Sequence, residues 1–235
     1  MSVLSQKFNA QALKERLAIY QLISGYYLDG VGSLDIESIS KISFLEQSDN
    51  ELLRMGYNKL RDGLAADIEQ ANYEYNRLFI GPDKVLAAPY ESVYRNSQRL
   101  MMQQETLRVR RFYNILGLGC AAVGNQPDDH LGLELECMSY LLYRMLQENE
   151  LRDVLIEYYR EFLDNHVLTW VFNHCEDVLN NSKTQLCGGM AMLLKGMLEI
   201  EKIETKEYVR EIYKQEIVAQ EIKGGELSER TMEII

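Results

Sequence analysis

Proline is scarce in this sequence of 235 residues, which contains Pro82, Pro89 and Pro127 and no others. At the usual frequency of about 5%, a chain of this length would contain about twelve. A proline in the interior of a helix costs about 3 kcal/mol, so long stretches without proline are typical of continuous helices. Each of the three prolines therefore indicates a place where the chain leaves a helix.

Long apolar runs are missing as well. No run approaches the roughly 18 residues that a membrane helix needs, and the start of the chain, MSVLSQKFNA, contains no apolar signal core. We therefore expect a soluble protein that stays in the cytoplasm, without stable insertion into a membrane.

Basic residues are outnumbered in this chain. The 25 Lys and Arg residues stand against 36 Asp and Glu, so the formal net charge is −11. Proteins that bind nucleic acid gain most of their affinity from Lys and Arg on the phosphates. The charge balance therefore argues against a nucleic-acid partner. The composition, 46% hydrophobic and 26% charged, is ordinary for a globular protein and argues against disorder.

Cysteine pairs and catalytic signatures are also absent. Cys120, Cys137, Cys175 and Cys187 lie far apart, without the close spacing of a zinc site or a redox motif, and we expect reduced, mostly buried thiols. The chain has no G-x-x-x-x-G-K-[ST], G-x-G-x-x-G, G-x-S-x-G or H-E-x-x-H pattern. The sequence thus contains no recognisable catalytic motif, and we predict that the protein is not an enzyme.

Apolar residues recur at helical spacing along the whole chain. Examples are Leu13, Leu17 and Tyr20 near the start, Leu131, Leu135, Met138, Leu142 and Met145 in the middle, and Leu186, Met190, Leu193 and Met197 near the end. No segment shows strict alternation of apolar and polar residues, which a half-buried strand would require. We therefore predict an all-α fold, a single bundle of about nine or ten helices.

The glycine-rich stretch GLGCAAVGNQP suggests a division of this bundle into two halves. We place a single all-α domain at residues 1–222, with an N-terminal half of about 1–116, a hinge of about 117–127 and a C-terminal half of about 128–222. Residues 223–235 are polar and are expected to form a loosely ordered tail. A hinge loop permits the exchange of halves between two chains, so both a monomer and a domain-swapped dimer are allowed.

The strongest local signal is PDDHLGLELECM, residues 127–138. Asp128 is placed to cap the helix that begins near Leu131, with Asp129 and His130 at the rim of the loop and Glu134 one turn below His130. A capped helix start explains this pattern, but a histidine beside carboxylates also suits a pH-sensitive or cation-binding site. No third ligand at fixed spacing supports a metal site. The alternative kept open is a helical metalloprotein or nucleotide hydrolase using His130, Asp129 and Glu134.

A second dense window is EYNRLFIGPDKVLAAPYESVY, residues 74–94. Tyr75, Leu78 and Phe79 end a helix with a largely apolar face, and the loop that follows them is itself apolar before Pro89 and Tyr90. An apolar loop either packs onto the core or covers a surface that binds something else. The second reading is a groove wall for an apolar peptide.

Together with FLDNHVLTWVF (residues 162–172), these two windows resemble the TorD/DmsD family of redox-enzyme maturation chaperones, in the same order and at similar separations. The resemblance extends over roughly residues 72–178. It implies an all-α cytoplasmic chaperone that binds the twin-arginine signal peptide of a molybdenum-dependent oxidoreductase precursor. Such a chaperone assists cofactor insertion and prevents premature export. The molybdenum cofactor would belong to the client, so no cofactor is assigned to this chain, and weak nucleotide binding stays open.

The resemblance also carries peptide-binding residues to positions in this sequence. These are Tyr75, Leu78, Phe79, Pro89, Tyr90, Pro127, Asp129 and His130. We add Glu134 because it lies one turn below His130. Trp170, His166 and Phe172 are predicted to pack in the core instead.

These residues suggest a binding hypothesis that depends on one spatial condition. Asp129 would receive an arginine or a peptide amide, His130 would orient it, and Leu78, Phe79 and Tyr90 would wall the apolar end. For this, the segment after Phe79 and the cap before Leu131 must meet in space. A third possibility is a structural adaptor that docks onto a folded oxidoreductase subunit.

Overall fold

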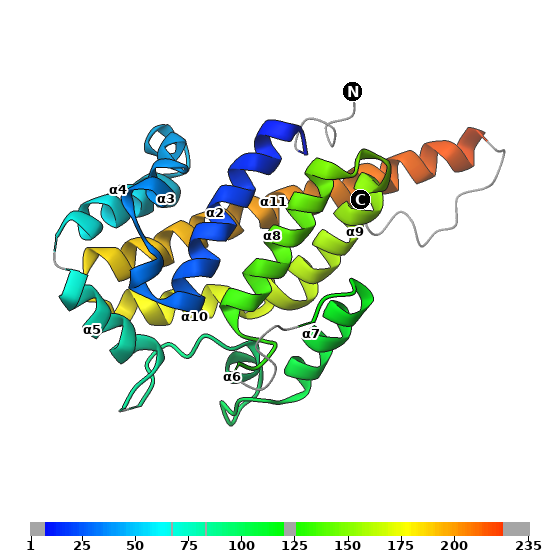
Figure 1. Ribbon diagram of the computed structural model, residues 1–235. Coiled ribbons are helices and arrows are strands. Elements are labelled where there is room, and N and C mark those ends of the chain that lie inside the picture. The colour runs from blue at the N-terminus through cyan, green and yellow to red at the C-terminus, as the bar shows by residue number, and fades with distance from the viewer. Residues whose placement is uncertain (1–7, 67, 83, 120–125, 223–235) are drawn as a thin grey trace.

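The structure, a computed structural model, describes residues 8–66, 68–82, 84–119 and 126–222, with side chains up to residue 207. The described residues form helices and turns, without a strand. The helices are α2 (Ala10–Asp29), α3 (Ile36–Ser40), α4 (Glu51–Ala65), α5 (Ile68–Phe79), α6 (Glu91–Arg95), α7 (Gln104–Ile115), α8 (Leu131–Gln147), α9 (Arg152–Phe162), α10 (Leu168–Asn181) and α11 (Gln185–Ile222). The predicted all-α fold is confirmed (Figure 1).

Short turns connect several of these helices. Val31–Ser33, Ser43–Gln47 and Asn149–Leu151 are 3-10 turns, and Leu163–Val167 is a π-helical turn between α9 and α10. Pro82, Pro89 and Pro127 all lie outside helices, as predicted from the cost of proline in a helix interior. The predicted tail, residues 223–235, and residues 120–125 of the predicted hinge lie outside the described residues.

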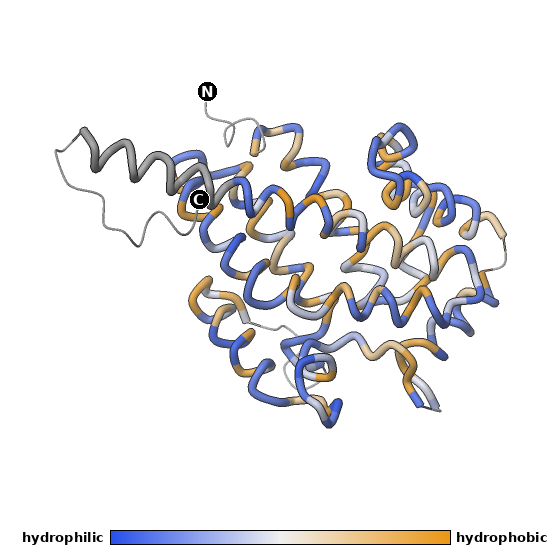
Figure 2. The backbone as a smooth tube through the Cα atoms, turned by 180° about the vertical axis from the view of Figure 1, so that it is seen from behind, coloured by the Kyte–Doolittle hydropathy of each residue, from blue (hydrophilic) through white to orange (hydrophobic). Residues whose placement is uncertain are grey.

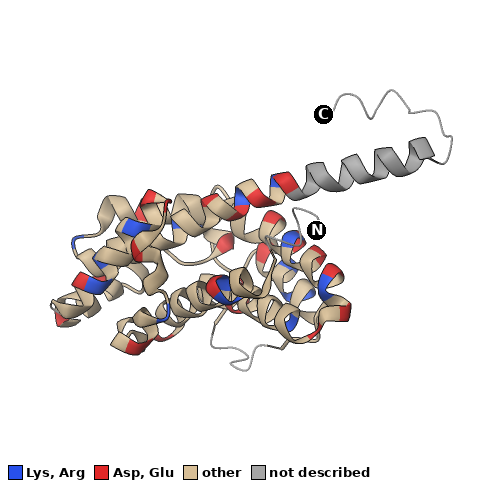
Figure 3. Ribbon diagram, turned by 90° about the horizontal axis from the view of Figure 1, so that it is seen from above, with Lys and Arg blue, Asp and Glu red and all other residues tan. Residues whose placement is uncertain are grey.

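Two helix pairs, each joining the first third of the chain to a later part, organise the bundle. Helix α2 packs against α8, and α4 packs against α11; Figure 1 shows α2 and α8 side by side in the middle of the molecule. Figure 2 shows hydrophobic and hydrophilic stretches alternating along the helices, as expected when each helix buries one face. Figure 3 shows charged residues of both signs spread over the described helices.

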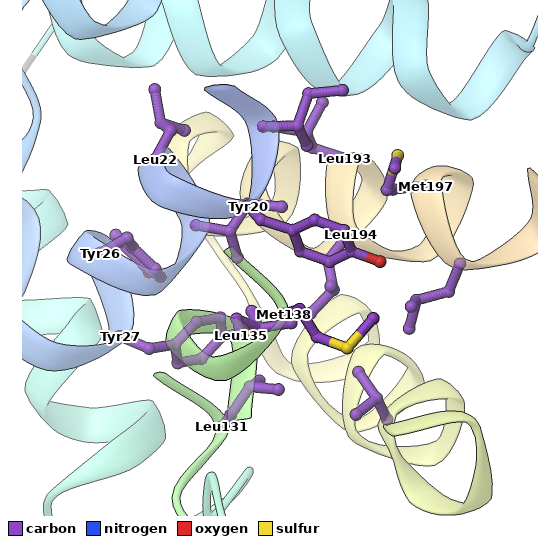
Figure 4. Packing of buried hydrophobic residues seen from close by; sticks show 14 of the residues in the cluster. Tyr20, Leu22, Tyr26, Tyr27, Leu131, Leu135, Met138, Leu193, Leu194 and Met197 are labelled. Atoms are coloured by element: carbon purple, nitrogen blue, oxygen red, sulfur yellow. The ribbon is translucent and has the colours of Figure 1, made fainter. Parts of the chain in front are cut away.

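The core lies where α2, α8 and α11 meet. Figure 4 shows Tyr20 and Tyr26 from α2, Leu135 from α8 and Leu194 from α11 converging in this space, and all four side chains are fully buried. Such close packing is what makes an interior sensitive to the loss or gain of a single methyl group. Cys137, Cys175 and Cys187 are buried free thiols, as predicted, whereas Cys120 lies outside the described residues.

Glycines permit the close contact between α4 and α11. A Cβ atom added at Gly56 would lie 2.7 Å from the backbone nitrogen of Leu193, and one at Gly189 would lie 2.8 Å from that of Leu60. Real Cβ atoms do not approach backbone this closely, so a side chain at either position would push the two helices apart. This contact holds the N-terminal part of the chain against the last helix.

Candidate functional site

The two sequence windows singled out above meet through their backbones. The loop after α5 first turns back on that helix, where the Ala87 N–H donates to the Leu78 carbonyl oxygen at 2.9 Å. Tyr90 and His130 then form an antiparallel bridge. Beside it, the Leu131 N–H donates to the Pro89 carbonyl at 2.8 Å. The spatial condition on which the binding hypothesis depends is therefore met.

Asp129 lies beneath this junction, and its side chain is 0% exposed. One carboxylate oxygen, Oδ2, accepts a hydrogen bond of 2.8 Å from the Ser92 backbone N–H, and Oδ1 accepts one of 2.7 Å from the Thr106 hydroxyl. Its backbone carbonyl also accepts the Glu91 N–H at 3.0 Å. Asp129 was expected at the rim of the loop, and this expectation is wrong because its side chain is buried. Its carboxylate instead connects α6 and α7 to the start of α8.

The helix cap also differs from the expectation. His130, not Asp128, is the N-cap of α8, and its Nδ1 accepts the Gly132 backbone N–H at 3.2 Å. Asp128 instead accepts two hydrogen bonds from Arg110, at 2.9 and 2.6 Å. Burial lowers the pKa of His130 to about 4, so its ring is neutral near pH 7 and Nδ1 is free to act as the accepting atom. His130 is 2% exposed and therefore does not lie at the rim either.

Glu134 is a fully buried carboxyl group on the inward face of α8. Its Oε2 accepts a hydrogen bond of 3.1 Å from the indole N–H of Trp170, while Oε1 has no hydrogen-bond partner among the described residues. Burial, and then the negative charges of Glu91 and Asp129, raise the pKa of Glu134 well above its usual value of 4.5. Glu91 in turn pairs with His166, with 2.8 Å between Oε2 and Nδ1. These side chains form one buried polar network between α6, α8 and the turn before α10.

Trp170 and His166 are buried, as the sequence predicted, and Phe172 is partly buried against the core. His166 does more than pack, however, because it provides the partner of the Glu91 carboxylate described above.

The predicted apolar wall is mostly interior. Tyr75, Leu78 and Phe79 are all buried. The Tyr75 hydroxyl donates to the Tyr27 carbonyl oxygen at 3.0 Å, and the Tyr75 and Phe79 rings meet edge to face with 4.9 Å between their centroids. Pro89 and Pro127 are buried too, and Tyr90 alone among the nine predicted residues keeps a partly exposed side chain. The assignment of these nine residues to peptide binding stays a prediction.

The chemistry available to this junction is limited by its own hydrogen bonds. Asp129, His130 and Glu134 each already accept a hydrogen bond from the protein. Within the described ranges, no group of three or more His, Cys, Asp or Glu side chains is arranged to hold a metal ion. What the junction does is fix the loop after α5 to the start of α8.

The described part of the chain also has open clefts. One, of about 620 Å³, borders the loop after α5 and is lined by Tyr73, Ile80 and Leu86 together with the cations Arg77 and Lys84. Another, of about 550 Å³, lies along α2 and α8 and is lined by Leu28, Asp29, Tyr113, Leu133, Glu136 and Tyr140, among others. Sequence reasoning missed the second cleft. The signal that was available is Leu133, an apolar residue off the buried stripe of α8, beside the exposed Glu136.

Comparison with known proteins yields matches over most of the chain. A family model described as nitrate reductase delta subunit matches residues 46–176. Chaperone protein TorD of Vibrio cholerae serotype O1 (strain M66-2) is 24% identical over 213 residues, which cover 85% of this chain and 96% of TorD. The probable Tat proofreading chaperone DmsD of Haemophilus influenzae is 27% identical over 134 residues, covering 57% of this chain and 60% of that protein.

A crystal structure is similar as well. It is that of an Archaeoglobus fulgidus protein assigned to redox enzyme maturation, with 20% identity, a TM-score of 0.46, and coverage of 77% of this chain and 91% of that one. No helix in the described part of the chain is both long enough and apolar enough to cross a bilayer.

Proposed function

The chain belongs to the nitrate reductase delta subunit family, and on this premise we propose that it is a redox-enzyme maturation chaperone that binds the twin-arginine signal peptide of a molybdenum-dependent oxidoreductase precursor. It acts in the cytoplasm by binding without turnover, and it holds the precursor back from export until the cofactor has been inserted. The similarity to TorD and DmsD over most of their length supports this proposal.

The observation that carries the proposal is the backbone bridge between Tyr90 and His130. It joins two of the three windows on which the family resemblance rests, and all three lie inside the region that the family model matches. Segments far apart in the sequence are thereby fixed as one largely buried junction, with Tyr90 as its partly exposed member. A pre-formed surface loses little conformational entropy when a peptide binds.

The physical chemistry of the two partners is complementary. A twin-arginine signal joins a cationic segment to an apolar one. The net charge of −11 attracts the first, although exposed ion pairs contribute only about 1 kcal/mol or less each. Burial of the apolar segment, at roughly 25 cal/mol per Å², therefore supplies most of the affinity.

Within this proposal, Asp129 has a positioning role. Its carboxylate oxygens accept hydrogen bonds from Ser92 and Thr106, and its side chain is fully buried. It therefore holds α6 and α7 in place at the bridge and does not itself receive an arginine. His130 likewise caps α8. The enzyme alternative requires these same side chains together with Glu134, and no contact in the described residues favours it.

Affinity purification of the tagged protein from its native cells tests the proposed function. We expect an oxidoreductase precursor that still carries its signal peptide to be enriched. Removal of the signal peptide from that precursor should abolish its recovery. Equal recovery of the mature enzyme would contradict the proposal and favour the adaptor reading.

A further inference from the structure

We infer that the groove between α2 and α8, lined by Leu28, Asp29, Tyr113, Leu133, Glu136 and Tyr140, receives the arginine pair and the adjoining apolar residues of the signal peptide. This inference rests on the proposed function and adds the place of binding. It does not depend on direct peptide contacts by Asp129, His130 or Glu134.

The groove exists because α2 and α8 approach closely along one line. The Ser24 hydroxyl on α2 donates to the Gly132 carbonyl oxygen on α8 at 2.8 Å. A Cβ atom added at Gly132 would lie 2.6 Å from Cγ of Leu28, so glycine is needed for this approach. The side chains outside this line of contact form the walls of the groove.

The groove is formed by two adjoining clefts. The first has a volume of about 550 Å³. The second, of about 460 Å³, is bordered by Gln21, Ser139 and Tyr143. Both are lined by Leu28, Asp29, Glu136 and Tyr140, so they are parts of one depression.

The floor of this groove is apolar. Leu28, Leu133 and Tyr140 are half-buried, and Tyr113 and Cys137 lie deeper, with buried side chains. Half-buried leucines on a helix lose their remaining water contact when an apolar segment lies over them, which favours binding. Ser139 at the second cleft is buried and bonded to the Leu135 carbonyl oxygen, so it adds no unpaired polar group to the floor.

The rim carries negative charge that nothing in the groove neutralises. Asp29 and Glu136 are exposed, and among the described residues neither forms an ion pair. Arg144 donates to the Tyr140 hydroxyl at 2.6 Å, but its charge is paired with Glu148. Asp29 is also the last residue of α2, a helix without a basic residue in its last turn. The negative end of the helix dipole therefore adds to its charge and favours a bound cation.

The cleft beside the loop after α5 provides an internal comparison. It is of similar size, about 620 Å³, and has an apolar lining of Tyr73, Ile80 and Leu86. Its charged lining residues, however, are Lys84 and Arg77, and the charge of Arg77 is paired with Glu74. An arginine pair meets the carboxylates of Asp29 and Glu136 at the α2/α8 groove and no acidic residue among the described lining of this cleft, so charge favours the groove.

Calorimetric titration of the full chain with a synthetic twin-arginine signal peptide tests this assignment. The double variant Asp29→Asn/Glu136→Gln removes the two charges of the rim. We expect it to weaken binding by roughly tenfold at low salt, since each exposed ion pair changes affinity by about fivefold or less. The loss should shrink as the salt concentration rises, because ions screen exposed charges. The matched control is Asp49→Asn/Glu161→Gln, which makes the same change in net charge at exposed positions outside the groove and should bind like the wild type.

A photoreactive group in the apolar part of the same peptide gives a second readout. Cross-links to the segments around Leu28 and Leu133 are expected. Cross-links confined to residues 73–86 would overturn the assignment, as would equal affinity of the groove variant and the wild type, while the proposed function would stand in both cases. Failure of the wild-type protein to bind any twin-arginine peptide would overturn the proposed function and the groove with it.

Discussion

The indole N–H of Trp170 donates a 3.1 Å hydrogen bond to the carboxyl group of Glu134, a residue 36 positions earlier in the chain. Both side chains are buried, and Glu91 and Asp129 lie close enough for their negative charges to raise the pKa of Glu134. The bond links α10 to the inner face of α8, about one helical turn after His130 of the Tyr90–His130 bridge. A polar network therefore supports the junction on which the proposed function depends.

Replacement of Glu134 by glutamine should change how stability depends on pH. The carboxyl pKa is raised in the folded state, so the folded protein binds more protons than the unfolded chain above about pH 4.5, the usual value. The wild type therefore loses stability as the pH rises above this value, through the folded-state pKa. The Glu134→Gln variant still accepts the Trp170 bond but does not titrate. Its free energy of unfolding relative to the wild type should rise with pH in urea denaturation series, and a difference that stays constant with pH would contradict the raised pKa.

His130 should produce the opposite slope. Burial lowers its pKa to about 4 from 6.5, so the unfolded chain binds more protons between these two values. Its contribution to stability is complete above pH 6.5 and is lost as the pH falls toward 4. His130→Asn keeps a side chain that caps α8 but cannot be protonated, and should lose less stability than the wild type over this window. Ring resonances in an NMR titration that move with a midpoint near 6.5 would contradict the account.

Asp129→Ala should destabilise the fold by about 2–4 kcal/mol, because it leaves the buried donors of Ser92 and Thr106 without an acceptor. The double variant Asp129→Ala/Thr106→Val removes one of these orphaned donors and should recover part of the loss. Chemical denaturation measures both. If Asp129→Ala kept full stability but lost signal-peptide binding, the carboxylate would contact the peptide directly and the positioning role would be wrong.

Gly56→Ala should also lower the free energy of unfolding, by about 1–3 kcal/mol, because its methyl group would press on the backbone of α11 near Leu193. The control is Gly25→Ala on α2, where the nearest atom outside the helix lies 3.7 Å from the added Cβ. There the gain in helix propensity, up to about 1 kcal/mol, should dominate. We expect the melting temperature to fall for Gly56→Ala and to rise for Gly25→Ala. Equal shifts of the two melting temperatures would show that the α4/α11 contact tolerates a side chain.

Local sequence patterns predicted the helices but not the partners of the polar residues. The spacing of Leu131, Leu135 and Met138 defines the inner face of α8, and Glu134 lies beside that face, so its burial follows from helical register. Its bond to Trp170 does not, because that contact depends on how two distant helices pack. In the same way, a cap at the start of α8 was predictable, but its identity depends on where the helix begins: His130 directly precedes Leu131, and Asp128 accepts hydrogen bonds from Arg110 instead.

The predicted recognition residues show the same division. The meeting of the two windows was inferred correctly from the family resemblance, and the bridge confirms it. The sequence could not show that Tyr75 and Phe79 pack inward against Tyr26 and Tyr27, because residue type alone does not separate a core aromatic from a groove wall. Nor could it locate the groove between α2 and α8, whose walls come from segments about 100 positions apart.

The most direct measurement is the affinity of the purified protein for one oxidoreductase precursor with and without its twin-arginine signal peptide. If the protein is a signal-peptide chaperone, calorimetry will show binding of the complete precursor and a loss of at least tenfold when the signal peptide is removed. Equal affinity for the two forms would contradict the proposed function.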